Sequence, residues 1–114
     1  MSIAANRALV LEFYDRMSRL EFDRMFALMA DDATWTVAGN PALVHHSGVA
    51  TKDQRIAAFG NFTKAFATLD MEVRSIPAEE DRVAVELVTR CKTLNDIAYE
   101  NELFVLLRCK DARI

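Results

Sequence analysis

The period of the apolar residues changes near Leu69, and this change limits the folds that the chain can adopt. Before that point apolar side chains recur at helical spacing, as in the series Phe22, Met25, Phe26 and Met29. After it they alternate with polar side chains, most clearly over Arg82–Thr93. Helices followed by long antiparallel strands indicate an α+β fold in which the helices cover one face of a curved sheet.

Turn and capping residues divide the chain into expected elements. We predict helices over 3–17 and 22–29, and a third helix that begins at the capping box TKDQ, where the side chains of Thr51 and Gln54 accept from each other's backbone N–H groups. A short strand is predicted over 33–37, followed by a loop from Asn40 to Ala50. Further strands are predicted over 71–75, 82–93 and 99–109, and the segment KDAR at 110–113 is expected to form a hairpin turn.

The length of 114 residues predicts a single domain that spans residues 1–114. The net charge is −3 without a cluster of basic residues, so we expect no nucleic-acid partner. The sequence has no apolar run long enough to span a membrane and does not begin with a signal peptide, which leads us to expect a cytoplasmic protein without a membrane partner.

The two cysteines, Cys91 and Cys109, are predicted to be free thiols. If they lie on adjacent antiparallel strands, Cys91 is opposite approximately residue 102. Cys109 is then about 23 Å further along at roughly 3.3 Å per residue, which is too far for a disulfide. Neither their number nor their spacing indicates a metal site.

Several segments carry a resemblance to a known superfamily through their order and spacing along the chain. They are FYDRM, FALMADDATWTV, SGVATKDQRIAAF, DRVAVELVTR and YENELFVLLRCKDARI. Together they resemble the superfamily of ketosteroid isomerase and nuclear transport factor 2, and most of all its polyketide-cyclase-like and limonene-epoxide-hydrolase-like branches. The resemblance implies a cone-shaped α+β barrel, with three N-terminal helices packed on a curved, mostly antiparallel sheet. It also implies a homodimer and no cofactor.

Such domains usually continue past the last hairpin into another strand, whereas this sequence ends at Ile114. We therefore expect the last strand to be missing or truncated, or its place to be covered by a partner.

The resemblance puts steroid isomerase chemistry in doubt, because that chemistry needs a carboxylate base and an oxyanion hole. The base position falls on Val37 and the oxyanion acid falls near Phe104, and both residues are apolar. Tyr14 is a weak catalytic candidate, with a phenol that either faces the cavity or lies at the edge of the core.

The resemblance to epoxide hydrolases leaves another candidate pair, Glu86 and Arg90. The polar positions on the first strand of those enzymes fall on Trp35 and Val37 here, whereas Glu86 and Arg90 share one face of the long strand. These two residues form either a displaced catalytic pair or ordinary cross-strand ion pairs.

The family alignment and the alternation of apolar residues disagree about which sheet face is inner. The alignment points Glu86 and Phe104 inward. The alternation instead turns Val85 and Leu87 inward, together with Asn101 on the next strand. We favour the apolar face as the inner one, with Asn101 as a polar group that faces the cavity.

Histidines 45 and 46 do not predict a metal site, because neighbouring side chains in an extended chain point to opposite faces. His46 remains a weak candidate for a general base, and a histidine in a loop at the cavity mouth is the alternative. The residues expected to line an apolar ligand pocket are Tyr14, Phe26, Trp35, Val37, Phe59, Phe62 and Asn101.

Three functions are compatible with these patterns. The first is a domain that binds a small lipophilic molecule in an apolar pocket, without established catalysis. The second is a cofactor-free isomerase, cyclase or epoxide-hydrolase-like enzyme that acts on a lipophilic substrate. The third is an interaction module that dimerises through the outer face of the sheet.

Overall fold

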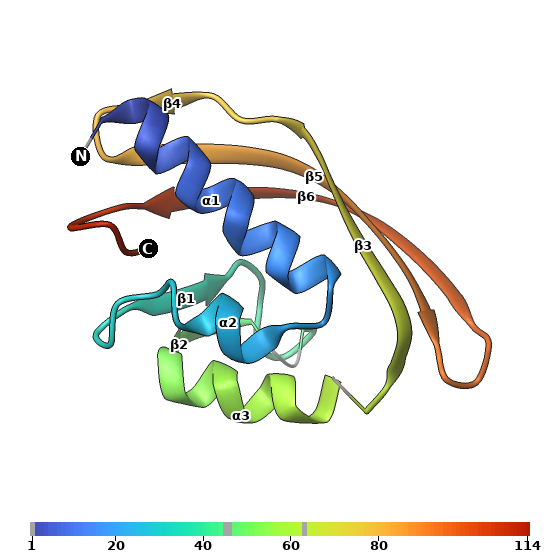
Figure 1. Cartoon of the computed structure of the whole chain (residues 1–114). Coiled ribbons are helices and arrows are strands. Elements are labelled where there is room, and N and C mark those ends of the chain that lie inside the picture. Colours follow the sequence, from blue (N-terminus) through green and yellow to red (C-terminus); the bar gives the residue numbers. More distant parts are fainter. Residues whose placement is uncertain (1, 45–46, 63) are drawn as a thin grey trace.

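A four-stranded antiparallel sheet curves around three helices in the computed structural model (Figure 1), which describes residues 2–44, 47–62 and 64–114. The side chain of Phe62 also lies outside the described part. The elements follow the order α1 (Ile3–Ser18), α2 (Phe22–Phe26), β1 (Thr34–Val37), β2 (Gly48–Thr51), α3 (Lys52–Phe62), β3 (Phe66–Ser75), β4 (Ala78–Glu79), β5 (Arg82–Thr93) and β6 (Ala98–Arg108). This is the predicted α+β architecture of helices first and antiparallel strands later.

Strand β5 is the centre of the large sheet, and its register fixes which side chains share a face. It pairs with β3 and β4 along one edge and with β6 along the other. Leu87 lies directly opposite Val73 of β3 and opposite Leu103 of β6. Directly opposed residues point to the same face, so the inner face that packs on the helices contains Val83, Val85 and Leu87, and all three are fully buried.

The prediction that the apolar face is the inner one is therefore confirmed, and the family alignment was wrong at these positions. The pairing of β5 with β6 runs without a register shift, so no bulge reverses the faces. Glu86 lies directly opposite Phe104, and the side chain of Phe104 is 81% exposed on the outer face.

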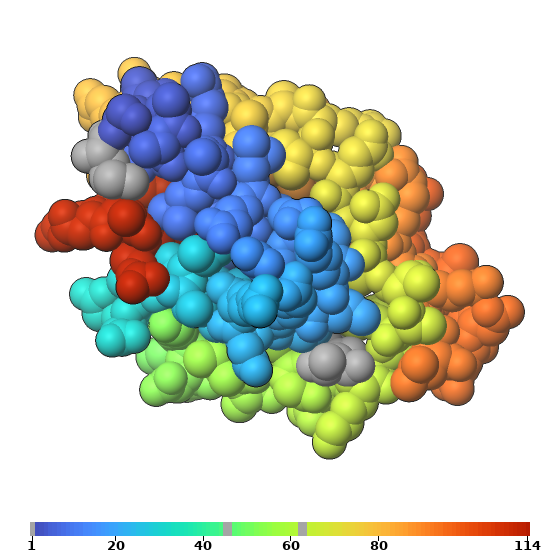
Figure 2. Space-filling model, in the orientation of Figure 1, coloured from blue at the N-terminus to red at the C-terminus, as the bar shows by residue number. Residues whose placement is uncertain are grey.

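Helix α1 crosses the inner face of the sheet (Figure 1) and brings one apolar stripe to it. The Ser2 hydroxyl caps the helix by accepting from the backbone N–H of Ala5 at 3.0 Å. Val10, Phe13 and Met17 are buried at intervals of three and four residues, as helical spacing predicts. The β5–β6 hairpin projects beyond the helices as the orange part of Figure 2, which agrees with the exposure of Leu94 and Ile97 near its turn.

Strands β1 and β2 form a separate hairpin, so the two sheets do not close into a barrel. The strand predicted over 33–37 is present as β1. Strand β2 was missed, because Gly48–Thr51 lies inside the segment that we expected to be a loop. Burial alternates along this short strand, but its half-buried positions are Gly48 and Ala50 and its 70% exposed Val49 is apolar, so the sequence lacks the apolar–polar alternation that indicates a strand. Its pairing with β1, Trp35 opposite Ala50, defines it instead.

The capping box before α3 is present as predicted. The backbone N–H of Thr51 donates to Gln54 Oε1 at 2.8 Å, and the backbone N–H of Gln54 donates to Thr51 Oγ1 at 3.2 Å. These two bonds satisfy donors that the first turn of a helix leaves without partners. They fix the start of α3 directly after β2, which places the first turns of the helix beside the β1–β2 hairpin.

The end of the chain returns to the start of the small sheet. Lys110 and Arg113 form the predicted hairpin turn. The backbone N–H of Ile114 then donates to Leu28 O at 2.9 Å, and Ile114 O accepts from the N–H of Ala30 at 2.8 Å. Both cysteines are free, as predicted, and both are buried. Within the described residues, no helix has the length and apolar character needed to cross a membrane.

Candidate functional site

An apolar pocket of about 520 Å³ opens between β1 and α3. We call it the Trp35 pocket. Its lining consists of Trp35, Val37, Arg55, Ala58, Phe59, Asn61 and Ala65. Strand β1 supplies one wall, because Trp35 and Val37 are two residues apart and point to the same face. Helix α3 supplies most of the other wall.

A cluster of aromatic rings makes the wall between this pocket and the core. The ring centroid of Trp35 lies 5.4 Å from that of Phe59 and 6.0 Å from that of Phe13. Phe59 also packs edge-to-face on Phe22 and Phe26, at 5.2 and 5.3 Å. Edge-to-face packing restricts the tilt of each ring, so the pocket has a preformed aromatic wall.

Arg55 is the charged member of the pocket, and sequence reasoning did not find it. Its Nη2 donates to the carbonyl oxygens of Trp35 at 3.2 Å and Gly48 at 3.5 Å, and its Cζ lies 6.0 Å from the centroid of the Trp35 ring. Its Nε is buried and has no acceptor among the described residues. The available signal was helical spacing, since Arg55 precedes Phe59 by one turn and shares its face.

Three of the residues predicted to bind a ligand, Trp35, Val37 and Phe59, come together in the Trp35 pocket. Phe26 is buried in the core, with its ring centroid 6.4 Å from that of Trp35. Asn101 is on the inner face of the sheet, opposite Thr89, but it does not line the Trp35 pocket.

Tyr14 is a core residue that packs edge-to-face on Phe13 at 5.2 Å, and only 3% of it is exposed. Burial raises the pKa of its phenol well above the usual value, because the anion would lose its hydration. The phenol is therefore protonated at neutral pH and is unsuited to act as a base. Tyr14 is not among the residues that line the Trp35 pocket.

The structure does not bring Glu86 and Arg90 to this pocket, because both lie on the outer face of the sheet. Arg90 Nη1 is 2.6 Å from Glu72 Oε2, and Arg90 also pairs with Glu100 at 3.7 Å. This contact with Arg90 lowers the pKa of Glu72. Glu86 instead accepts from the Ser75 hydroxyl at 3.5 Å. Arg90 thus forms cross-strand ion pairs, as in the alternative interpretation, whereas the contact of Glu86 is a cross-strand hydrogen bond.

Two further predicted site residues cannot be compared with the pocket. His46 lies outside the described residues, as does the side chain of Phe62. Among the residues that are described, no group of three or more histidine, cysteine or acidic side chains is arranged to hold a metal ion.

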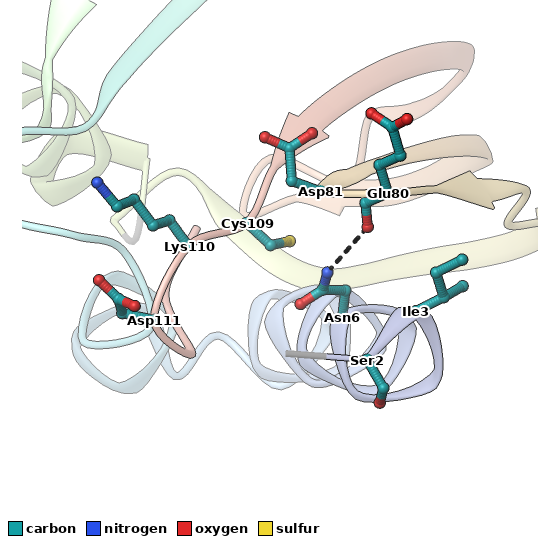
Figure 3. A pocket seen from close by; sticks show the side chains of 8 residues that line it. All are labelled: Ser2, Ile3, Asn6, Glu80, Asp81, Cys109, Lys110 and Asp111. Atoms are coloured by element: carbon teal, nitrogen blue, oxygen red, sulfur yellow. Dashed lines mark hydrogen bonds between the residues drawn. The ribbon is translucent and has the colours of Figure 1, made fainter.

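A second hollow, of about 480 Å³, lies where the start of α1, the β4–β5 turn and the end of β6 meet (Figure 3). We call it the polar hollow. Asn6 is its buried polar residue, and the amide of Asn6 donates to Glu80 O at 3.4 Å. Burial and the neighbouring Asp81 carboxylate raise the pKa of the Cys109 thiol. Lys110 at the rim carries the opposite charge to Asp81 and Glu80, so the hollow has no single sign of charge.

The three helices and the curved antiparallel sheet form an α+β fold that solved NTF2-like proteins share. Residues 10–114 match the SnoaL-like domain. The chain therefore belongs to the SnoaL-like domain family, as the resemblance implied. A search among curated proteins found no match.

Solved structures with the same fold include three bacterial proteins. A protein of unknown function from Burkholderia pseudomallei, described as NTF2-like, is 20% identical with a TM-score of 0.80, over 99% of this chain and 86% of that one. AclR, a putative hydroxylase from Streptomyces galilaeus, is 22% identical with a TM-score of 0.81, over 98% and 71%. An epoxide hydrolase from M. tuberculosis, resembling limonene epoxide hydrolase, is 14% identical with a TM-score of 0.77, over 97% and 77%. At these identities the likeness establishes the fold and not the chemistry.

Proposed function

We propose that this chain binds a small apolar molecule in the Trp35 pocket. The observation that carries the proposal is the preformed aromatic wall of Trp35 and Phe59 along a space of about 520 Å³. This volume is in the range of about 300–1,000 Å³ that is typical of small-molecule sites. Val37, Ala58 and Ala65 make much of the remaining lining apolar, so the ligand has a largely apolar body.

Trp35 is the single tryptophan of the chain, so its fluorescence reports directly on the pocket. A titration with sterols, terpenes and aromatic polyketides is expected to quench or shift its emission and to raise the melting temperature. The matched variant Val37→Phe narrows the pocket beside Trp35 without adding a second tryptophan and should weaken binding. A panel that changes neither emission nor melting temperature would sink the proposal.

Binding is favoured over catalysis by the composition of the pocket wall. A cofactor-free isomerase, cyclase or epoxide hydrolase needs a general base or acid within reach of its substrate. The described lining residues include one guanidinium and one amide but no carboxylate. The solved hydrolase and the putative hydroxylase with this fold make an enzyme the alternative function, and a turnover assay on the compounds that bind distinguishes the two.

We also propose that two copies associate through the outer face of the sheet. Phe104 and Leu106 of β6 are 81% and 61% exposed on this face, and adjacent exposed apolar side chains of this size are typical of association surfaces. Sedimentation of the wild-type chain and of Phe104→Asp tests this. A wild-type chain that sediments as a monomer at high concentration contradicts it.

A further inference from the structure

We infer that Arg55 gives the Trp35 pocket a binding point for a carboxylate, so the ligand is an apolar molecule with one acidic group. This inference rests on the proposed function, because it describes the ligand of the same pocket. It starts from the charge balance around α3.

Arg55 is the one charged side chain among the described residues of the pocket wall, and no described carboxylate forms an ion pair with it. Lys52, one turn earlier on α3, shows the contrast: its Nζ pairs with Asp31 at 3.4 Å and donates to Met29 O at 3.0 Å. A cation beside an apolar wall loses hydration, and a counter-charge normally compensates for that loss. For Lys52 the chain supplies the counter-charge, whereas none of the described residues supplies one for Arg55.

The hydrogen bonds of Arg55 within the described residues use only some of the donors of its guanidinium. Nη2 donates hydrogen bonds to the carbonyl oxygens of Trp35 and Gly48 and so connects the two strands of the β1–β2 hairpin. Nε is buried without an acceptor among the described residues. A buried donor without an acceptor costs free energy, and a small shift of the side chain toward a bound ligand oxygen would relieve this cost.

The geometry and composition of the wall favour a carboxylate over other acceptors. A guanidinium forms a strong charge-assisted hydrogen bond with a carboxylate oxygen even where one of its nitrogens is engaged elsewhere, as Nη2 is here. The Trp35 ring lies close to the guanidinium and limits its rotation. Beyond Arg55, the described side chains of the lining add the Asn61 amide and the Trp35 indole N–H but no second cation, so the wall is poorly suited to a doubly charged phosphate.

Calorimetric titration with two nearly isosteric probes tests the inference. Biphenyl-4-carboxylate carries the acidic group, and biphenyl-4-carboxamide is its neutral counterpart. We expect the wild-type chain to bind the carboxylate about tenfold more tightly than the amide, because a hydrogen bond to a charged group is stronger than one to a neutral group. Arg55→Met should abolish this preference while still binding the amide, and Arg55→Lys should restore part of it.

The control variant Lys110→Met removes a positive charge at the polar hollow, away from the Trp35 pocket. Lys110→Met should keep the full preference for the carboxylate probe over the amide probe. If Lys110→Met loses this preference, carboxylate binding belongs to the polar hollow and the inference is overturned. If Arg55→Met does not fold, because the hairpin loses its Nη2 bonds, the wild-type, Arg55→Lys and Lys110→Met titrations still decide the question.

The failure of this inference and the failure of the proposed function give different results. Equal affinity of the wild-type chain for the two probes refutes the role of Arg55 and leaves the apolar pocket in place. Binding of neither probe, together with the absence of any response of Trp35 to the larger panel, refutes the proposed function and this inference with it.

Discussion

Replacement of Leu87 by alanine tests the assignment of the two sheet faces most directly. Leu87 is fully buried on the central strand, between Val73 and Leu103 on the neighbouring strands. Truncation of a fully buried leucine costs about 2–5 kcal/mol, and the cost is high where strong packing prevents collapse of the cavity. Because Leu87 has a strand on each side and helices above it, we expect a loss of about 3 kcal/mol in the free energy of unfolding. At roughly 4 °C per kcal/mol for a chain of this size, the melting temperature falls by about 12 °C.

The matched control is the same substitution on the opposite face, Leu106→Ala. Leu106 is on the adjacent strand but is 61% exposed, so its truncation should change the free energy of unfolding by about 0.5 kcal/mol or less in the monomer. Denaturant unfolding monitored by circular dichroism measures both variants. Equal losses at low protein concentration would refute the assignment of the faces. A loss for Leu106→Ala that appears only at high concentration would instead indicate association through the outer face.

Two further predictions concern α3 and the core. Thr51→Ala removes the cap bond to the N–H of Gln54 and should cost about 1 kcal/mol, measured by denaturant unfolding; an unchanged midpoint would contradict the role of the capping box. For Tyr14, the folded state keeps the phenol protonated at pH values where the unfolded chain ionises it, above about 10. The folded chain then binds more protons, so stability should fall as the pH rises through this range, and Tyr14→Phe should flatten the fall. A wild-type profile with the same slope as the variant would refute the burial of that phenol.

The sequence predicted the parts of the fold that depend on a local period. The period-two alternation from Val83 to Leu87 identified the inner face, because a residue that packs on the helices must be apolar. The alignment with distant relatives failed at Glu86 and Phe104, because it carried over positions without testing their burial. Strand β2 was missed because its exposed residue Val49 is apolar, and the segment is held in place by pairing with β1 and by the bond from Arg55 to Gly48 O.

The site was less predictable than the fold, because its polar group comes from a helix that the sequence identifies only by its apolar stripe. Trp35, Val37 and Phe59 were found as apolar residues near a cavity, and burial patterns can indicate such residues. From the sequence, Arg55 looks like an ordinary solvent-exposed helix residue. Its position next to the Trp35 carbonyl depends on the pairing of β1 with β2, and β2 was not predicted.

The pocket and the β1–β2 hairpin are therefore linked through a single side chain. Nη2 of Arg55 bonds carbonyl oxygens on both strands of the hairpin, while the pocket is lined by the same arginine and by Trp35 of β1. A ligand that bonds to this guanidinium would meet a group already oriented by the hairpin, and an oriented donor loses less entropy on binding than a free one. Shortening Arg55 should consequently weaken both the hairpin and ligand binding, whereas changes on the outer face at Glu86 should affect neither. Hydrogen exchange of the β1–β2 backbone amides in Arg55→Lys and Glu86→Gln tests this link. Equal exchange rates in the two variants would contradict a role of Arg55 in holding the hairpin.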